Sequence, residues 1–302
     1  MSSPRSLVDD YLAERSLYVA SSTVANDITH LERFFEFLDG HGVEHVGLIS
    51  FETLDAYRHS LETLPGKRGK IVSDAFKHAA LKVPRFFLNW ASCRGLTLVD
   101  FSLYPLPHRT AKDISVPTVQ QVSMLLDVPD TSRPQGWRDR LVLESFYTLG
   151  LRRRESHRLS IGDLNLSRQT VRVVGKRQRQ RLLPLSDRLC QLLTEYLKRM
   201  RPQLRPFPDE QALWVSPQNG TRLGFTYLRD IVRRNSSRLG LQIYPHLLRH
   251  ACATHMLEAG AGLKHIQAFL GHDSPSSTER YTKVTGPELR KEFDRCHPRA
   301  RS

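Results

Sequence analysis

The sequence lacks the features of two large classes, membrane proteins and exported proteins. Across its 302 residues, no apolar run approaches the roughly 18 residues needed for a membrane-spanning helix. The first residues, MSSPRSLVDDYLAERS, carry acidic side chains where a secretory signal has its apolar core. We therefore expect neither an export signal nor a membrane partner.

Cysteine is also scarce. The four cysteines, Cys93, Cys190, Cys252 and Cys296, lie far apart and form no CxxC pair. Disulfide frameworks and structural zinc sites depend on regularly spaced cysteines. The sequence therefore predicts a cytoplasmic protein with reduced thiols and no metal site.

Acidic residues are outnumbered by basic ones, but only in one part of the chain. The whole sequence has a formal charge of +14 at pH 7. Residues 1–110 hold 12 Lys and Arg against 13 Asp and Glu, whereas the remainder holds 33 against 18, a net charge of +15. A region this basic attracts a polyanion, most commonly nucleic acid. Affinity for acidic membranes and a solubilising surface are the alternatives.

Apolar residues in the first third of the chain recur at helical spacing. Three segments, opening near Ser21, Ser50 and Ser73, each carry one apolar stripe, which is typical of amphipathic helices. Pro84 should kink or break the third segment. Because such helices bury their stripes against one another, we expect a small helical bundle over residues 1–104.

The remainder is predicted to form a larger domain. Residues 105–117 contain several prolines and few periodic apolar residues, as a linker does. From a capping box at Thr118 onward, helical segments surround a predicted hairpin over 169–174 and 181–185. Residues 213–215 are predicted to be one more short strand. The expected fold class is mainly α, of the α+β type, in which a helical bundle precedes a larger helical domain with a small antiparallel sheet.

Two candidate functional segments are weak when taken alone. In YTLGLRRRE, Arg152 follows a glycine that ends a predicted helix, and Glu155 lies three residues on; a structural ion pair would explain both. In GKRQRQR, Lys176 lies at the tip of the predicted hairpin, where a lysine is usually a solvated turn residue. An ammonium group at such a tip can, however, reach a DNA groove or a reacting phosphate.

Two further segments combine imidazole, guanidinium and phenol groups. His246 and Arg249 in HLLRH are three residues apart and face one way on a helical turn. A guanidinium can bind two phosphate oxygens in a fork while an imidazole moves protons, although a structural pair is equally consistent. His272 follows a glycine, and Tyr281 lies nine positions later in a polar stretch, where a tyrosine is normally a packing residue with a hydrated hydroxyl.

In this order and spacing, the four segments together resemble the tyrosine recombinase, or phage integrase, family. The matching residues are Arg152 and Glu155 as the first-arginine motif, Lys176 as the β-turn lysine, His246 and Arg249 as the HxxR pair, His272 after Gly271, and Tyr281. A shift of the first arginine to Arg153 is the alternative assignment. The chain length and the ending CHPRA are similar to Xer-type members.

The resemblance covers nearly the whole chain and implies a division of labour. Residues 1–104 would form a helical core-binding domain, 105–117 a linker and 118–302 the catalytic domain, with duplex DNA held between the two domains. The basic side chains expected to contact DNA are Lys67, Arg68, Lys70, Lys77, Arg177 and Arg179.

The resemblance also implies a mechanism. Tyr281 would attack phosphorus and form a 3′-phosphotyrosyl link, which conserves the bond energy, so that no metal, nucleotide or other cofactor is required. The remaining roles would be phosphate binding by Arg152 and Arg249, protonation of the leaving 5′-oxygen by Lys176, removal of the tyrosine proton with the help of His246, a hydrogen bond to phosphate from His272, and orientation of the site by Glu155.

Family members usually act as tetramers on two DNA sites. This implies a homo-tetramer, or a hetero-tetramer with a second recombinase, acting on double-stranded DNA at the nucleoid. The predicted helix 287–297 carries Leu289 and Phe293 four residues apart, and we expect it to be exchanged between protomers; packing on its own domain is the alternative. Chromosome-dimer resolution and integration or excision of a mobile element both fit the sequence.

Two other functions use the same residues. A type IB topoisomerase would share the arginine, lysine, histidine and tyrosine chemistry but would relax supercoils as a monomer. A catalytically silent DNA-binding protein could share the fold, although an intact set of catalytic residues disfavours it. A covalent protein–DNA adduct would distinguish an enzyme from a silent binder.

Overall fold

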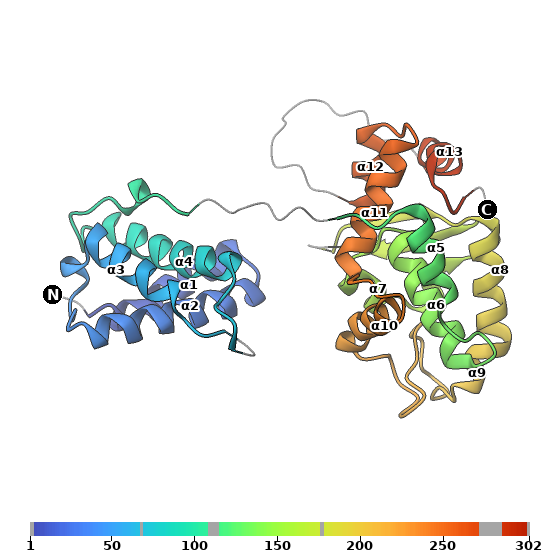
Figure 1. Ribbon diagram of the computed structural model, residues 1–302, viewed down its shortest axis with the longest axis horizontal. Coiled ribbons are helices and arrows are strands. Elements are labelled where there is room, and N and C mark those ends of the chain that lie inside the picture. The colour runs from blue at the N-terminus through green and yellow to red at the C-terminus, as the bar shows by residue number, and fades with distance from the viewer. Residues whose placement is uncertain (1–2, 67–68, 108–114, 176–177, 272–285, 301–302) are drawn as a thin grey trace. The chain divides into compact units, whose positions relative to one another are not determined.

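The computed structural model describes residues 3–66, 69–107, 115–175, 178–271 and 286–300. The chain divides into two compact units, residues 1–113 and 114–302 (Figure 1). This division falls inside the predicted linker 105–117, while the roles given to the two domains stay predictions. Among the described residues, no helix is both long and apolar enough to cross a membrane.

The first unit is a bundle in which α2 packs on α1 and α4, and α3 packs on α4 (Figure 1). Its core is built from the apolar stripes, with Phe34, Tyr57 and Phe87 fully buried. The helices are α1 (Val8–Tyr18), α2 (Ser21–Gly40), α3 (Phe51–Glu62) and α4 (Asp74–Ser92).

The helix starts in the first unit follow local capping chemistry. Ser50 caps α3 by accepting the Thr53 N–H, and Ser73 caps α4 by accepting the Phe76 N–H. Both predicted starts are therefore confirmed. The helix α2 begins at Ser21 as expected, but no side chain caps it.

Of the kink or break predicted at Pro84, the break is wrong. Helix α4 runs from Asp74 to Ser92 with Pro84 inside it, buried in the bundle. A proline in a helix removes one N–H donor and crowds one carbonyl, at a cost of about 3 kcal/mol. Burial of Leu81, Phe87 and Leu88 on the same helix offsets this cost, since each fully buried side chain contributes about 1.5–3 kcal/mol.

The second unit is a helical domain with a small sheet. Thr118 forms the predicted capping box with Gln121 and opens the first helix of the unit. The helices are α5 (Val119–Asp127), α6 (Pro134–Tyr147), α7 (Arg153–Arg158), α8 (Asp187–Glu195), α9 (Arg201–Gln203), α10 (Phe225–Ser237), α11 (Pro245–Glu258), α12 (Leu263–Leu270) and α13 (Gly286–Cys296), with a π-helical turn over Tyr196–Met200.

The sheet has three antiparallel strands in the order β1 (Leu164–Asn165), β2 (Thr170–Val174) and β3 (Gln180–Pro184). Strands β2 and β3 pair with Val173 opposite Arg181, which confirms the predicted hairpin. The strand predicted over 213–215 is wrong, because this segment makes only isolated bridges, such as Val215 with Arg222. Its side chains are buried, and the centroid of the Trp214 ring lies 6.0 Å from that of Tyr196 in the π-helical turn.

The C-terminal helix α13 packs on its own domain in this single chain, against α11, α12 and β3. Phe293 stacks on Phe269 with ring centroids 5.7 Å apart. Beyond the helix, His297 is fully buried, and Arg299 donates to the buried Glu144 carboxylate at 2.6 Å. In this single chain α13 therefore packs on its own domain, and exchange of the helix between protomers stays a prediction.

The burial of His297 makes a stability prediction. Burial lowers the pKa of His297 from 6.5 to about 3, so the unfolded chain takes up the proton first. The contribution of the buried neutral imidazole to the free energy of unfolding is fully present above about pH 6.5. It is lost as the pH falls toward 3, by at most about 1.4 kcal/mol per pH unit. Between pH 6.5 and 5, the free energy of unfolding of His297→Gln should therefore fall less steeply with decreasing pH. The difference in slope should correspond to the uptake of about one proton on unfolding.

Urea unfolding followed by fluorescence measures this slope. The chain has three tryptophans, and in a Trp90→Phe background only Trp137 and Trp214 remain, both in the second unit. A slope identical in the two proteins would show that the ring is protonated equally in the folded and unfolded states.

Candidate active site

The site begins where α6 ends. Gly150 adopts a left-handed conformation with φ of 56°, and a Cβ at this position would lie 2.5 Å from Leu270 Cδ2. Glycine is therefore required both for the backbone conformation and for the close approach of α12. This turn sets Arg152 directly before the first residue of α7.

Arg152 and Glu155 form the first part of the site. The backbone N–H of Arg152 donates to Oε2 of Glu155 at 2.9 Å, and its Nη1 donates to Oε1 at 2.8 Å. The other guanidinium nitrogen of Arg152 donates to the Gly271 carbonyl at 2.9 Å. The side chain of Arg152 is 40% exposed, whereas that of Glu155 is 3% exposed. Arg152 is thus partly exposed to solvent and is held by the buried Glu155 carboxylate.

Arg249 reaches the same place from α11. It donates to the carbonyls of Gly150 at 2.5 Å and Leu270 at 2.7 Å, and its Nη1 lies 3.8 Å from Oε2 of Glu155. Burial and then the charge of Arg152 lower the pKa of Arg249 to about 10. The guanidinium therefore stays charged at neutral pH.

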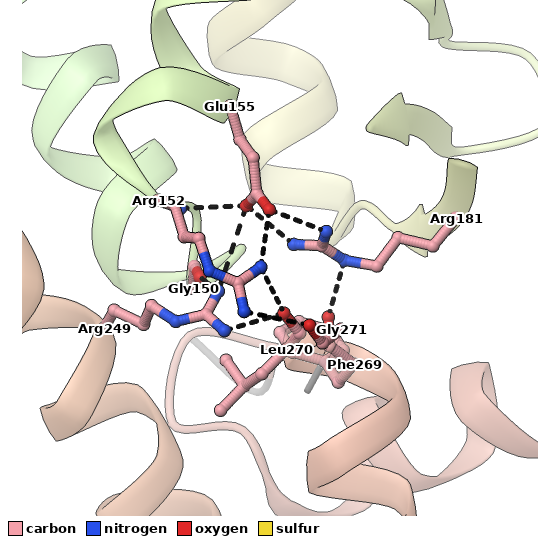
Figure 2. A network of polar contacts seen from close by, with 8 residues as sticks. All are labelled: Gly150, Arg152, Glu155, Arg181, Arg249, Phe269, Leu270 and Gly271. Carbon is pink, nitrogen blue, oxygen red and sulfur yellow. Dashed lines mark hydrogen bonds and ion pairs between the residues drawn. The ribbon is translucent and has the colours of Figure 1, made fainter. Parts of the chain in front are cut away.

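Arg181 completes the group and was not predicted from the sequence. It grips Glu155 with both terminal nitrogens, at 3.0 and 2.9 Å, and its Nε donates to the Phe269 carbonyl at 2.9 Å. Figure 2 shows the three guanidinium groups converging on Glu155 and on the end of α12. Strand alternation could have indicated this position, because Arg181 lies on the same face of β3 as the buried Leu183 and therefore points toward the interior of the domain.

We call Arg152, Arg181 and Arg249 with Glu155 the arginine cluster. Burial alone would raise the pKa of Glu155, but the hydrogen bonds and charge of Arg181, and then those of Arg152, lower it below its usual value. Three guanidinium groups and one carboxylate leave a net formal charge of +2. The C-terminal end of a helix carries partial negative charge, so the last turn of α12 helps to hold these like charges together.

His246 lies in the first turn of α11, three residues before Arg249. Partial burial and then the charges of Arg249, His250 and Arg152 lower its pKa. The imidazole is therefore neutral at pH 7 and able to accept a proton. Arg153, the alternative first arginine, instead lies 3.9 Å from the Phe225 ring centroid and takes no part in the arginine cluster.

Lys176, His272 and Tyr281 lie outside the described residues. The residues just before two of them belong to the site. Gly271 accepts a hydrogen bond from Arg152, and a Cβ on Gly175 would lie 3.5 Å from Oε1 of Glu155. The chain thus leads from the arginine cluster directly to both predicted positions.

The side chains predicted to contact DNA differ in their surroundings. Lys70 and Arg179 are exposed, but Lys77 pairs with Glu62, which weakens its attraction for phosphate. Lys67, Arg68 and Arg177 lie outside the described residues.

A second basic surface, on α10, was also missed by the sequence analysis. Arg229 and Arg233 project from this helix, and Arg233 is 68% exposed. Arg234 follows them and donates to the buried Asp139 carboxylate at 2.6 Å. Asp230 pairs with Arg229 and Arg233 at 3.5 and 3.8 Å, so the surface keeps a net positive charge. The basic residues lie close together in the sequence, on the exposed side of an otherwise partly buried helix, and counting charge over this segment could have found them.

Comparisons with known proteins agree on the kind of molecule. The sequence model of the phage integrase family matches residues 116–287. The chain is 30% identical over 302 residues to the tyrosine recombinase XerD of Staphylococcus epidermidis, covering 97% of this chain and 99% of that protein. It is 42% identical over 183 residues to the tyrosine recombinase XerC of Pelotomaculum thermopropionicum, covering 59% of this chain and 60% of that protein.

Solved structures share the fold at low sequence identity. One is a lambda integrase tetramer bound to a Holliday junction, with a TM-score of 0.68 and 17% identity, covering 93% of this chain and 80% of that one. Another is the XerH site-specific recombinase bound to its difH substrate before cleavage, with a TM-score of 0.65 and 21% identity, covering 89% and 78%.

Proposed function

The chain belongs to the phage integrase family and is a tyrosine recombinase, an enzyme of site-specific DNA recombination; from this premise we propose that it cuts and rejoins duplex DNA through Tyr281. The observation that carries the proposal is the arginine cluster, which places a net positive charge beside the chain segments that lead to Lys176 and His272. Fixed positive groups of this kind stabilise the charge that develops on a reacting phosphate.

The proposed step balances without an outside energy source. The Tyr281 oxygen attacks phosphorus, the bond from phosphorus to the 5′-oxygen breaks, and a 3′-phosphotyrosyl link forms. A phenol of pKa about 10 is a poor nucleophile at pH 7, so neutral His246 would accept its proton while Lys176 protonates the 5′-oxygen. Religation is the reverse of this step, and the two transfers conserve one phosphodiester bond.

The remaining residues would bind the phosphate or hold the site. Arg152 and Arg249 would bind the non-bridging oxygens, with His272 adding a hydrogen bond. Glu155 would orient the two arginines, since it contacts both. The helical unit of residues 1–104 would bind the DNA core site together with the catalytic unit of residues 118–302.

The partners we propose are double-stranded DNA and further recombinase protomers. The lambda integrase neighbour is a tetramer on a Holliday junction, which supports a homo-tetramer, or a hetero-tetramer with a second recombinase, on two DNA sites. In such an assembly α13 would move from its own domain to a neighbouring protomer. Acting on chromosomal DNA, the enzyme would work at the nucleoid in the cytoplasm.

The test uses a nicked suicide duplex that bears the native site, found first by recovering DNA that flanks the gene. In the presence of EDTA we expect an SDS-resistant protein–DNA band, and mass spectrometry of its digest should place the nucleotide on the peptide containing Tyr281. A duplex that is bound in a mobility shift but yields no adduct would favour the silent DNA-binding protein. Relaxation of a supercoiled plasmid lacking the site would favour the topoisomerase.

The basic surface of α10 gives a separate prediction about DNA affinity. We expect the double variant Arg229→Gln/Arg233→Gln to reduce the slope of log affinity against log salt by up to about 2, because each phosphate contact releases about one counterion. The cleavage rate at saturating DNA should stay unchanged. Fluorescence anisotropy across a salt series measures the slope, with Arg199→Gln on the turn after α8 as an exposed control. An unaltered slope in the double variant would place DNA elsewhere.

A further inference from the structure

We propose that Arg181 is a positioning residue for DNA cleavage, which holds Glu155 so that Glu155 in turn holds Arg152 and Arg249 in place to bind the phosphate. This inference rests on the proposed cleavage reaction and extends it to a residue outside the family pattern recognised in the sequence. It concerns how the arginine cluster is built rather than which group reacts.

The contacts of Arg181 join three elements that are far apart in sequence. From β3, its two terminal nitrogens bind both oxygens of Glu155 on α7, and its Nε binds the Phe269 carbonyl on α12. A Cβ on Gly271 would lie 3.0 Å from Nη1 of Arg181, so the guanidinium lies close to the turn that precedes His272. Figure 2 shows this side chain approaching Glu155 from the side opposite Arg152.

The same contacts argue that Arg181 does not bind the phosphate itself. Both terminal nitrogens of Arg181 donate to the Glu155 carboxylate, whose negative charge opposes that of the guanidinium. The terminal nitrogens of Arg249, in contrast, donate to neutral carbonyl groups. The two-pronged grip of Arg181 uses the planar fork that distinguishes arginine from lysine. The effect of Arg181 on the reaction must therefore pass through Glu155 and the end of α12.

Arg181 also favours the ionised form of Glu155. The charged groups that face this carboxylate are Arg152 from the start of α7, Arg181 from β3 and Arg249 from α11. Burial would raise the pKa of Glu155, and Arg181 contributes most to lowering it. Without Arg181 the carboxyl would take up a proton at a higher pH and would lose its hold on the backbone N–H and guanidinium of Arg152.

The first experiment measures the rate of adduct formation on the suicide duplex at saturating DNA. We expect Arg181→Met to slow it by roughly 10²-fold, the loss that follows when reacting groups are misplaced by about 1 Å. Arg181→Lys should recover part of the rate because it restores the charge without the fork. DNA affinity, measured in a Tyr281→Phe background, should change less than about threefold. Arg172→Met, on the neighbouring strand β2 and paired with Asp163, is the matched control.

A double-mutant cycle with Glu155→Gln separates positioning from general structural damage. If Arg181 acts through Glu155, then adding Arg181→Met to Glu155→Gln should slow cleavage by less than about tenfold further. The double variant also removes the unpaired buried carboxylate and so remains testable where Arg181→Met alone does not fold. If the rate loss of the double variant equals the product of the losses of the two single variants, the proposal is overturned.

A titration of Glu155 decides the question without any DNA. In protein labelled with ¹³C at glutamate carboxyls, with Glu155→Gln used for assignment, Arg181→Met should raise the pKa of Glu155, and Arg181→Lys should raise it less. An unmoved pKa in the folded variant would contradict the proposal. If the wild-type protein forms no adduct, the proposed function fails, but the titration still shows whether Arg181 holds Glu155 ionised.

Discussion

Replacing Tyr281 by phenylalanine is expected to abolish the covalent protein–DNA adduct completely. Phenylalanine keeps the ring but has no oxygen to attack phosphorus, so neither cleavage nor the phosphotyrosyl link can form. Because the arginine cluster is untouched, the variant should bind its site with wild-type affinity. SDS gels of the suicide duplex measure the adduct, and mobility shifts on the same DNA measure binding.

The matched control for this variant is Tyr244→Phe. Tyr244 is an exposed tyrosine of the same unit and directly precedes α11. The control should give as much adduct as the wild-type protein. An adduct that survives in Tyr281→Phe would show that another residue is the nucleophile, and loss in Tyr244→Phe alone would point to that tyrosine.

Replacing Arg249 by glutamine is expected to slow cleavage by about 10³-fold or more. Loss of one fixed donor to a transition-state oxygen typically costs about 10²–10³-fold in rate. Here the change also removes the donors to the Gly150 and Leu270 carbonyls, which lie at the turns before Arg152 and His272. Rates of adduct formation at saturating DNA measure the loss, and circular dichroism checks that the variant is folded.

Arg249→Lys distinguishes the fork from the charge alone. Arg249 uses two nitrogens for two carbonyls at once, and a lysine has a single nitrogen in place of the planar fork. We therefore expect lysine to restore less than about a tenth of the wild-type rate. A lysine variant that cleaves as fast as the wild-type protein would mean that a point charge is sufficient at this position.

Features set by neighbouring residues could be predicted from the sequence. The helix starts at Ser50, Ser73 and Thr118 depend on side chains within one turn, and the β2–β3 hairpin depends on alternation and a short connection. The strand prediction for residues 213–215 was wrong because a short apolar run is equally compatible with a buried strand and with other buried structure. Pro84 does not break its helix because packing in the bundle outweighs the local cost of the proline.

In the candidate site, too, local pairs could be predicted from the sequence and contacts between distant segments could not. The pairing of Arg152 with Glu155 is local, and it could be anticipated from their spacing. The part played by Arg181 depends on contacts between β3, α7 and α12, which no spacing within one segment reveals. The burial of His297 likewise comes from the packing of α13 on its own domain.

The carbonyl groups at the end of α12 have a consequence for phosphate binding. Residues 269–271 accept hydrogen bonds from all three arginines. Ordering a free arginine side chain costs about 1.5–2 kcal/mol of conformational entropy. In the proposed reaction that cost is met on folding, so DNA would meet a preorganised set of charges and more of its binding energy would be left for the transition state.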